Sequence, residues 1–351
     1  MNIVVLCGGL SPERDVSVSS GSRITAALKG LGHRAVLVDM YFGLEGYSGT
    51  LESAFDLPLP EGVGGIAADE PDLDAVRDAR ALRSGSLFGE RVLEICAAAD
   101  IVFLALHGRC GEDGRVQAAF DLMGIKYTGS GYMGSALAMD KHLTKRIAQS
   151  AGVLTPEWEL FGPAELEDTS DIIGRVGLPC VVKPLNSGSS IGVEIVHTPE
   201  QFDKALHNAA MQGDGVITER YISGREIQIS ILGGEPLPSI EISSGDGFYD
   251  YMHKYQPGAA VEISPAPIPA EAEARLASAA LAVYNALGLK ALARADFIYD
   301  SDGRFWFLEI NTLPGMTPTS LAPQEAAAAG LSYEALCQRI IDLAFEGEAW
   351  S

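Results

Sequence analysis

Apolar residues recur along the chain with two different periods, and the changes of period divide it into strands and helices. Short apolar runs between glycine, proline and polar residues predict buried strands, whereas apolar residues three or four apart predict amphipathic helices. We expect strands at residues 2–7, 35–39, 101–106, 180–183, 192–196, 216–219, 225–232, 291–300 and 304–310. We expect helices at residues 17–29, 115–123, 135–151, 269–287 and 332–345.

The order of these elements predicts the first sheet. The chain opens with a strand, a loop over residues 8–15, a helix and a second strand, which is the order of a parallel sheet covered by helices. Residues 43–90 are rich in Gly, Pro, Asp and Glu without a clear period, so we assign them no regular element. Residues 243–260, rich in Gly and Tyr, predict a long loop, and a domain boundary is expected near 127–131.

The last two strands predict a hairpin with a defined register. The sequence DSDGR at residues 300–304 is a strong turn signal between them. With a four-residue loop, the facing pairs are Asp300 with Phe305, Asp296 with Glu309, and Arg294 with Asn311. Because side chains alternate along a strand, the other face collects core residues, namely Ala295, Phe297, Tyr299, Trp306, Leu308 and Ile310.

This register places two carboxylates side by side at the end of a core hairpin. At about 4 Å, Asp296 and Glu309 would repel by roughly 4 kcal/mol with an effective dielectric of about 20. Together with Asn311 they offer only oxygen ligands, which suit Mg²⁺ or Mn²⁺ and, for Mg²⁺, a phosphate-bearing substrate nearby. The alternative is that Arg294 alone neutralises the pair.

A Gly- and Ser-rich loop gives a second phosphate signal. The segment PLNSGSS at residues 184–190 follows Lys183, so backbone N–H groups, hydroxyls and one ammonium could surround an anion. A plain turn without a ligand is the alternative. Residues 188–192 also match the G-x-S-x-G nucleophile elbow, but the strand pattern after them disfavours Ser190 as a hydrolase nucleophile.

Composition and charge exclude some classes of partner. The 351 residues are 47% hydrophobic and carry a net charge of −22, so an acidic surface should repel nucleic acid and anionic membranes. The N-terminus shows no basic leader or cleavage site, and the five cysteines are scattered without a C-x-x-C motif. We therefore expect a cytoplasmic protein with reduced, mostly buried thiols.

Nine motifs in order resemble the ATP-grasp superfamily and, within it, the D-alanine–D-alanine ligase family. They are GGLSPERDVS (8–17), LHGRCGEDG (106–114), YTGSG (127–131), MDK (139–141), VKPLNSGSSIG (182–192), ERYISGRE (219–226), YDYMHKY (249–255), RAD (294–296) and EINTLPGMTPTSL (309–321). The resemblance covers nearly the whole chain. Any one motif is modest support, but the complete series is specific.

The resemblance implies a mixed α/β and α+β fold of three lobes, the ATP-grasp fold. An N-terminal Rossmann-like lobe (1–130) would bind substrate, while a central lobe (131–218) and a C-terminal lobe with the metal site (219–351) would grip ATP. It also implies ATP-dependent joining of two D-alanines through an acyl phosphate, for peptidoglycan precursors. ATP, two Mg²⁺ or Mn²⁺ ions and a homodimer belong to the same expectation.

The resemblance assigns roles to individual residues. Those for ATP are Lys141, Lys183, Glu219, Tyr221, Ile222, Glu226 and Lys254, and those for the metal ions are Asp296, Glu309 and Asn311. Those for the amino acids are Glu13 at the first ammonium, His107 at a substrate carboxyl, and Ser320 and Leu321 at the second substrate. Arg294 and the Gly315 N–H would stabilise the oxyanion. Glu13, Ser189 and Tyr255 would form a hydrogen-bonded link under a lid at 243–260.

Other functions stay open at this stage. A ligase with another acceptor, such as D-serine, has the same motifs, although the pair Lys254-Tyr255 favours an amine acceptor over relatives that form esters. A non-enzymatic nucleotide-binding protein is a third possibility, against which the complete set of charged motif residues counts. Singly, each residue also has a plainer reading, such as solvation of Glu13 or core packing of His107 and Tyr255.

Overall fold

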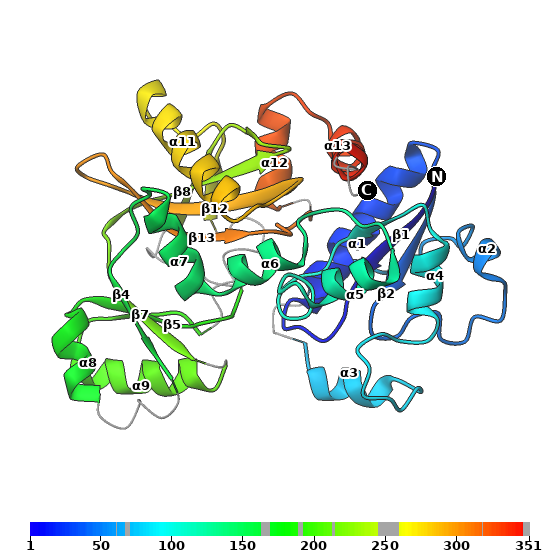
Figure 1. The fold of residues 1–351 in the computed structure, drawn as a ribbon, viewed down its shortest axis with the longest axis horizontal. Coiled ribbons are helices and arrows are strands. Elements are labelled where there is room, and N and C mark those ends of the chain that lie inside the picture. The colour runs from blue at the N-terminus through cyan, green and yellow to red at the C-terminus, as the bar shows by residue number, and fades with distance from the viewer. Residues whose placement is uncertain are drawn as a thin grey trace.

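The structure, a computed structural model, describes residues 1–60, 62–66, 71–162, 169–188, 192–212, 215–244, 260–317 and 319–346. Figure 1 shows three lobes, with the N-terminal lobe at one end, the central lobe (β4 to β7) at the other, and the C-terminal sheet beside the central lobe. The expected parallel sheet near the N-terminus is confirmed, and two further sheets follow it along the chain.

The N-terminal lobe is built on a parallel sheet with the order β2-β1-β3. Its strands are Arg34–Asp39, Asn2–Cys7 and Ile101–Leu104, and its main helices are α1 (Arg14–Gly30), α4 (Val92–Ala98) and α5 (Arg115–Met123). The segment left unassigned at 43–90 contains the short helices α2 (Leu51–Ala54) and α3 (Leu73–Ala79). The Ser17 hydroxyl accepts the Gly8 N–H at 2.8 Å and donates to the Ala105 carbonyl at 2.7 Å, which fixes α1 against two strand ends.

The central lobe is a four-stranded antiparallel sheet with two helices. Its strand order is β4-β7-β5-β6, with bounds Trp158–Phe161, Val216–Arg220, Cys180–Pro184 and Glu194–Val196. Helices α8 (Thr169–Val176) and α9 (Pro199–Ala210) supply apolar side chains to a core that belongs to this lobe alone. A capping box between Thr198 and Gln201 begins α9.

The C-terminal sheet has the order β11-β10-β8-β12-β13, with β9 paired to β8. The strands are β8 (Gly224–Leu232), β9 (Glu235–Pro236), β10 (Ile240–Ser244), β11 (Ala260–Ile263), β12 (Leu292–Asp300) and β13 (Phe305–Asn311). Helices α6 (Tyr132–Met139), α7 (Lys141–Ser150) and α11 (Ala270–Ala286) pack on it. The expected helix 135–151 is thus two helices, divided where the Asp140 side chain accepts the Leu143 N–H and caps α7.

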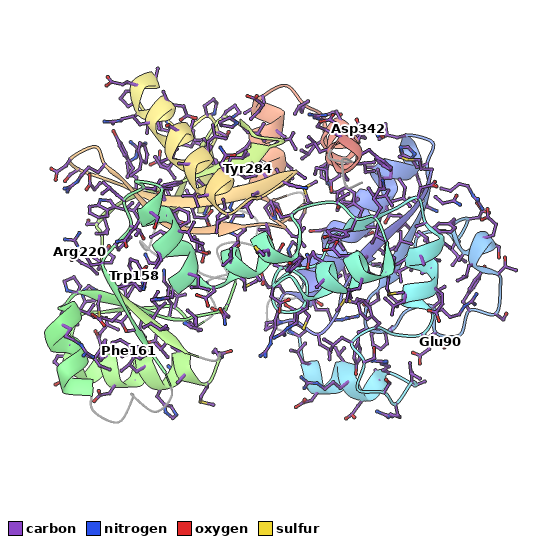
Figure 2. All side chains as sticks on the ribbon, in the orientation of Figure 1. Glu90, Trp158, Phe161, Arg220, Tyr284 and Asp342 are labelled. Atoms are coloured by element: carbon purple, nitrogen blue, oxygen red, sulfur yellow. The ribbon has the colours of Figure 1, made fainter. Side chains whose placement is uncertain are left out.

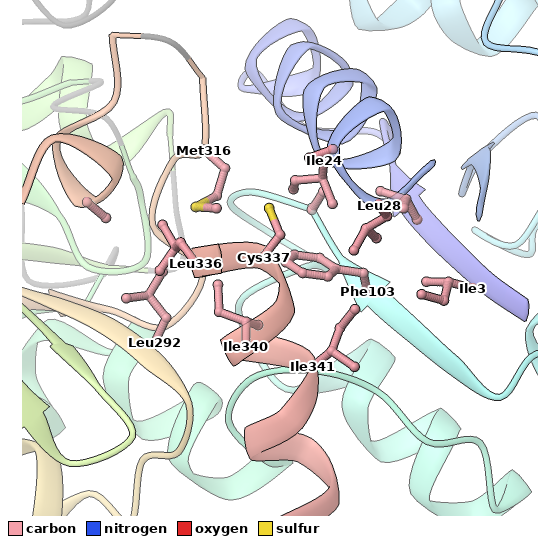
Figure 3. Packing of buried hydrophobic residues seen from close by; sticks show 14 of the residues in the cluster. Ile3, Ile24, Leu28, Phe103, Leu292, Met316, Leu336, Cys337, Ile340 and Ile341 are labelled. Carbon is pink, nitrogen blue, oxygen red and sulfur yellow. The ribbon is translucent and has the colours of Figure 1, made fainter. Parts of the chain in front are cut away.

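The N- and C-terminal lobes share one hydrophobic core. The chain ends in α12 (Leu321–Ala328) and α13 (Tyr333–Glu346), and α13 lies against α1. In Figure 3, Cys337, Ile340 and Ile341 of α13 stand between Ile24 of α1 and Leu292 of β12. Because apolar side chains from both lobes fill the same interior, these two lobes form one packed body.

The β12–β13 hairpin has the expected register at its functional end and a different one at its turn. Asp296 faces Glu309 and Arg294 faces Asn311, as predicted. A β-bulge then shifts the pairing by one residue, so that Phe305 faces Tyr299 and not Asp300. The prediction that Trp306 and Leu308 share the core face is therefore wrong. Phe305 and Phe307 pack on Phe297 instead.

The cysteines and the helices bear on two expectations stated for the whole chain. All five cysteines are free and buried, which confirms the expected thiols. None of the helices in the described ranges combines the length and the apolarity that a membrane crossing requires.

Candidate functional site

A cavity of about 310 Å³ lies between the central and C-terminal sheets. Apolar side chains of both sheets form its walls, among them Val181, Ile195, Ile298 and Leu308. It is lined by eight of the residues predicted for ATP and metal, namely Lys141, Lys183, Glu219, Tyr221, Ile222, Glu226, Asp296 and Glu309. A slot with apolar walls and charged groups at its ends suits a flat base joined to a phosphate chain.

Glu219 is the charged centre of the inner wall. It lies one residue before the end of β7 and is almost fully buried, and its Oε1 accepts a hydrogen bond from Lys183 Nζ at 2.5 Å. Its Oε2 lies 2.7 Å from Lys145 Nζ. Burial alone would raise the pKa of Glu219, but the two lysines outweigh burial and lower it. Glu219 is therefore an ionised acceptor inside the cavity.

The backbone after β7 continues this wall. The Tyr221 N–H donates to the Pro179 carbonyl at 3.3 Å, so that amide is already engaged. Glu226, at the start of β8, accepts a hydrogen bond from Gln228 Nε2 at 3.0 Å and lines the same cavity.

The paired carboxylates of the hairpin are neutralised by two cations. Arg294 donates from Nε and Nη2 to the two oxygens of Asp296, at 2.9 and 3.0 Å. Lys141 Nζ lies 3.2 Å from Glu309 Oε2 and also donates to the Ser187 carbonyl. Burial alone would lower the pKa of Arg294, but its ion pair with Asp296 raises it above the usual range. Arg294 is thus one of two neutralising cations.

The donor set at this corner fits divalent ions. Asp296, Glu309 and Asn311 supply two carboxylates and an amide from one face of the hairpin. Within the described ranges no three His, Cys, Asp or Glu side chains converge. That finding is compatible with Mg²⁺, since Mg²⁺ takes few protein ligands and completes its shell with water and phosphate.

A second cavity, of about 280 Å³, lies between the N-terminal and central lobes. It is lined by Glu13, Arg109, Arg115, Met139, Asn186 and Gly188, among others. A Cβ on Gly188 would lie 2.6 Å from Glu13 Oε2, and one on Gly108 would lie 2.9 Å from the same atom. Glycine at both positions therefore lets two loops close around the Glu13 carboxylate.

A narrow space of about 20 Å³ lies between the two cavities. It shares Lys141, Ser187 and Glu309 with the first cavity and Met139, Ser187 and Gly188 with the second. Asn311 and Glu112 are also among the residues that line it. The base-sized slot, the carboxylate corner and the Glu13 cavity therefore follow one another in space.

His107 and Glu112 hold the loop after β13. Glu112 accepts the Gly108 N–H at 2.8 Å and the Leu313 N–H at 3.2 Å. His107 Nδ1 lies 3.0 Å from the Leu313 carbonyl oxygen, which can only accept, so Nδ1 carries a proton. Burial lowers the pKa of His107, and its buried Nε2 has no hydrogen-bond partner among the residues that the structure describes. A neutral His107 therefore presents an unused acceptor.

Gly315, Ser320 and Leu321, predicted for the oxyanion and the second substrate, lie together after β13, whereas Arg294 lies on β12. A Cβ on Gly315 would lie 2.6 Å from Ser320 Oγ, so glycine permits this close approach. Ser320 Oγ accepts the Thr317 N–H at 2.9 Å, and Leu321 follows as the first residue of α12. Neither of the two cavities above is lined by Arg294, Gly315, Ser320 or Leu321.

Some predicted residues lie outside the described ranges, and two buried residues were missed. Ser189, Ser190, Lys254, Tyr255 and most of the loop 243–260 are not described. Sequence reasoning gave no role to Lys145, which is buried against Glu219, or to Glu112, which is buried and accepts the Gly108 and Leu313 N–H groups. Lys145 follows Lys141 by one helical turn, a spacing that places both on one face and could have revealed it.

Comparison with known proteins places the whole chain. The family model described as D-ala D-ala ligase N-terminus matches residues 2–130, and that described as D-ala D-ala ligase C-terminus matches residues 147–342. The D-alanine–D-alanine ligase of Pediococcus pentosaceus is 40% identical over 346 residues, 97% of each chain. That of Synechococcus sp. (strain JA-3-3Ab) is 40% identical over 350 residues, 99% of this chain and 95% of the relative.

Solved structures agree with this placement. The D-alanine–D-alanine ligase from Bacillus anthracis complexed with ATP matches with a TM-score of 0.73 at 29% identity, covering 99% of this chain and 97% of that one. VanG D-Ala:D-Ser ligase from Enterococcus faecalis matches with a TM-score of 0.74 at 28% identity, covering 97% of this chain and 98% of that one. The chain therefore belongs to the D-alanine–D-alanine ligase family and has its ATP-grasp fold.

Proposed function

We propose that this protein joins two molecules of D-alanine to D-alanyl-D-alanine at the expense of ATP, with an acyl phosphate as intermediate. The observation that carries this proposal is the spatial order of the cavities, from a base-sized slot through a carboxylate corner to the cavity at Glu13. Transfer of a phosphoryl group from nucleotide to amino acid requires that order. The product supplies peptidoglycan precursor synthesis.

ATP takes the first cavity in this proposal. Glu219 and the backbone of Tyr221 and Ile222 hold the base, and Glu226 holds the ribose. Lys141 and Lys183 contact the phosphates, and Lys254 belongs to the same set. Asp296, Glu309 and Asn311 would hold two Mg²⁺ or Mn²⁺ ions, which neutralise phosphate charge when bound.

The first D-alanine lies at Glu13, which binds its ammonium. One oxygen of its carboxylate attacks the γ-phosphorus, the bond to ADP breaks, and an acyl phosphate forms. Positioning and neutralisation of charge carry this step, since phosphoryl transfer needs little covalent help from the protein. Ser189 and Tyr255 extend the link from Glu13, and the loop 243–260 excludes water that would hydrolyse the acyl phosphate.

The second D-alanine lies at Ser320 and Leu321. Its amine, as the free base, attacks the acyl carbon. The carbon–oxygen bond to phosphate then breaks, and the proton that the nitrogen loses leaves with the inorganic phosphate. Arg294 and the Gly315 N–H stabilise the oxyanion of the tetrahedral intermediate. For this step, Arg294 must release at least one of its two hydrogen bonds to Asp296. Metal ions bound at Asp296 would favour that release.

A direct test measures phosphate release with ATP, Mg²⁺ and D-alanine alone, followed by mass spectrometry of the product. We expect one phosphate per D-alanyl-D-alanine. Arg294→Ala should lose turnover while retaining ATP affinity, and Arg304→Ala, at the exposed turn of the same hairpin, should behave as wild type. Normal turnover in Arg294→Ala would remove the oxyanion role.

A second acceptor is a real alternative because VanG, a D-Ala:D-Ser ligase, is as similar in structure as the D-alanine–D-alanine ligase above. Competition between D-alanine and D-serine at the second site, read by product mass, separates the two. We also propose a cytoplasmic homodimer, for which light scattering of the purified protein gives the mass directly.

A further inference from the structure

Lys145 is a fully buried cation that none of the steps above uses. It lies on α7, has no solvent exposure, and places Nζ 2.7 Å from Glu219 Oε2. The same Nζ donates to Thr155 Oγ1 at 2.6 Å, and it lies 5.3 Å from the centre of the Trp158 ring. Burying an unpaired ammonium costs several kcal/mol, so the pairing of Lys145 with Glu219 and Thr155 is what allows it to be buried here.

Lys145 and Glu219 belong to different lobes. Helix α7 packs on β13 of the C-terminal sheet, whereas Glu219 belongs to β7 of the central sheet, opposite Trp158 of β4. In Figure 2, Trp158 and Arg220 are labelled close to this junction. The ion pair therefore joins the wall of the nucleotide cavity to the body that carries the metal ligands.

Glu219 is held by two lysines with different surroundings. Lys183, from β5 of the same sheet, lines the nucleotide cavity and can turn to a phosphate. Lys145 is not among the residues that line this cavity. When Lys183 engages a phosphate, Lys145 remains as the cation that keeps the buried Glu219 carboxylate ionised and oriented.

The hydrogen-bonded chain continues from Lys145 into β13. The Thr155 hydroxyl accepts from Lys145 and donates to the Phe307 carbonyl at 2.9 Å. The Phe307 N–H donates to the Leu154 carbonyl at 2.8 Å. Since β13 is the edge strand of its sheet, Leu154 and Thr155 take the place of a missing neighbour at this residue.

Phe307 adjoins the bulge that sets the metal corner. The register shifts between Phe307, which faces Phe297, and Glu309, which faces Asp296. Leu308 is the extra residue, and it points its apolar side chain to the nucleotide cavity. The hydrogen bonds to the backbone N–H and carbonyl of Phe307 therefore hold the bulge in place. The bulge in turn determines the direction in which the Glu309 side chain points.

We propose that Lys145 is a positioning residue that couples nucleotide recognition at Glu219 to the placement of the metal ligand Glu309, through Thr155 and Phe307. This inference rests on the proposed function, in which Glu219 contacts the base and Glu309 a divalent ion. As a consequence, bound nucleotide should raise the affinity for the metal ion, and bound metal should raise the affinity for the nucleotide. The contacts at the junction between the lobes transmit this effect.

The test uses Thr155→Val and Lys145→Met with a matched control, Thr144→Val. Thr144 is also buried, but its hydroxyl donates to the Leu137 and Ala138 carbonyls. The affinity for Mn²⁺ is measured by electron paramagnetic resonance, with and without the non-hydrolysable analogue AMP-PNP. Binding of AMP-PNP is measured by calorimetry, and thermal melting confirms the fold of each variant.

Lys145→Met should weaken the binding of AMP-PNP about tenfold or more, because it removes one buried ion pair from Glu219. Thr155→Val should leave AMP-PNP nearly unchanged and weaken Mn²⁺ in its presence by roughly threefold to tenfold, as for one neutral hydrogen bond. Thr144→Val should change neither. Lys145→Arg, which keeps the charge, should recover part of the nucleotide affinity.

The coupling is overturned if Thr155→Val and Thr144→Val bind Mn²⁺ equally in the presence of AMP-PNP. Should Lys145→Met fail to fold, the comparison of the two valine variants decides alone. A wild-type protein that releases no phosphate with D-alanine would instead overturn the proposed function. The two failures are therefore distinct.

Discussion

At the scale of single residues, the site is governed by buried charges whose partners decide their state. Glu219 is kept ionised by two lysines, whereas Glu112 and Glu325 lack a cation at hydrogen-bonding distance among the described contacts. Burial, followed by the nearby charge of Glu13, raises the pKa of Glu112 to about 8. Similar carboxyl groups in one protein therefore take opposite protonation states near neutral pH.

Glu325 predicts a measurable dependence of stability on pH. Burial raises its pKa to about 8 although Ser230 donates two hydrogen bonds to it. The folded protein then binds more protons than the unfolded chain between about pH 4.5 and 8, so the free energy of unfolding falls as pH rises through this window. Glu325→Gln should lose less stability across it than wild type in urea titrations, because Glu112 remains in both proteins. Parallel profiles would contradict the assignment.

His107 predicts an uptake of protons on substrate binding. A substrate carboxylate can hydrogen-bond Nε2 only if that nitrogen carries a proton, and the free site keeps the ring neutral because burial lowers the pKa of His107. Binding of D-alanine near pH 7.5 should therefore take up about one proton. Calorimetry in buffers of different ionisation enthalpy measures this number, with His107→Asn as the control that should abolish it. An unchanged number in the variant would mean that another group takes the proton.

At the scale of elements, the hairpin β12–β13 shows what local sequence can predict. Alternation and the turn signal gave the pairing of Asp296 with Glu309 correctly, because both are local properties of the strands. They could not give the bulge, since it depends on the distant pair Leu154 and Thr155. The predicted register is therefore wrong only in the half of the hairpin next to the turn.

Other elements were missed for different physical reasons. Helix α9 carries a capping box at Thr198 that sequence inspection could have found. Helix α4 follows Arg91, which has a φ of 59° and makes no side-chain cap, so its start leaves little local signal. Eight residues that the motifs assign to ATP and metal line the first cavity, whereas Lys145 and Glu112 could be singled out only from contacts between lobes.

The loop after β13 predicts a non-additive pair of substitutions. Gly315→Ala would place Cβ 2.6 Å from Ser320 Oγ, which we expect to destabilise the protein by about 1–3 kcal/mol and to lower turnover. Ser320→Ala removes the clashing atom, so the double variant should be more stable than the sum of the single effects. Chemical denaturation measures the cycle, and Gly174→Ala in α8, where a Cβ meets nothing within 4 Å, is the control. Additive losses would mean that the loop relaxes without Ser320.

At the scale of the whole molecule, two of the three lobes are one packed body. Residues of α13 complete the interior that also contains α1 and β12 (Figure 3), whereas the core of the central lobe is separate. A cation–π contact also joins these two lobes, since Cζ of Arg23 in α1 lies 4.5 Å from the centre of the Tyr333 ring in α13. The N- and C-terminal lobes should therefore open and unfold together.

Ile341→Ala tests this unity. The side chain is fully buried, and its loss should cost about 2–5 kcal/mol. Native-state hydrogen exchange should accelerate in both β1 and β12, because both depend on the same interior. The matched variant Ile172→Ala, in the separate central core, should accelerate exchange in β5 and β7 alone. Acceleration confined to β12 in Ile341→Ala would mean that the two lobes are independent.

The separate central core bears on the order in which products leave. The central lobe supplies Lys183 to the nucleotide cavity and Gly188 to the cavity at Glu13, so it forms one wall of each. A single rotation of that lobe would uncover both ends of the reaction path at once. ADP and the dipeptide would then leave in random order. Product-inhibition patterns should therefore show random release and not a fixed order of release.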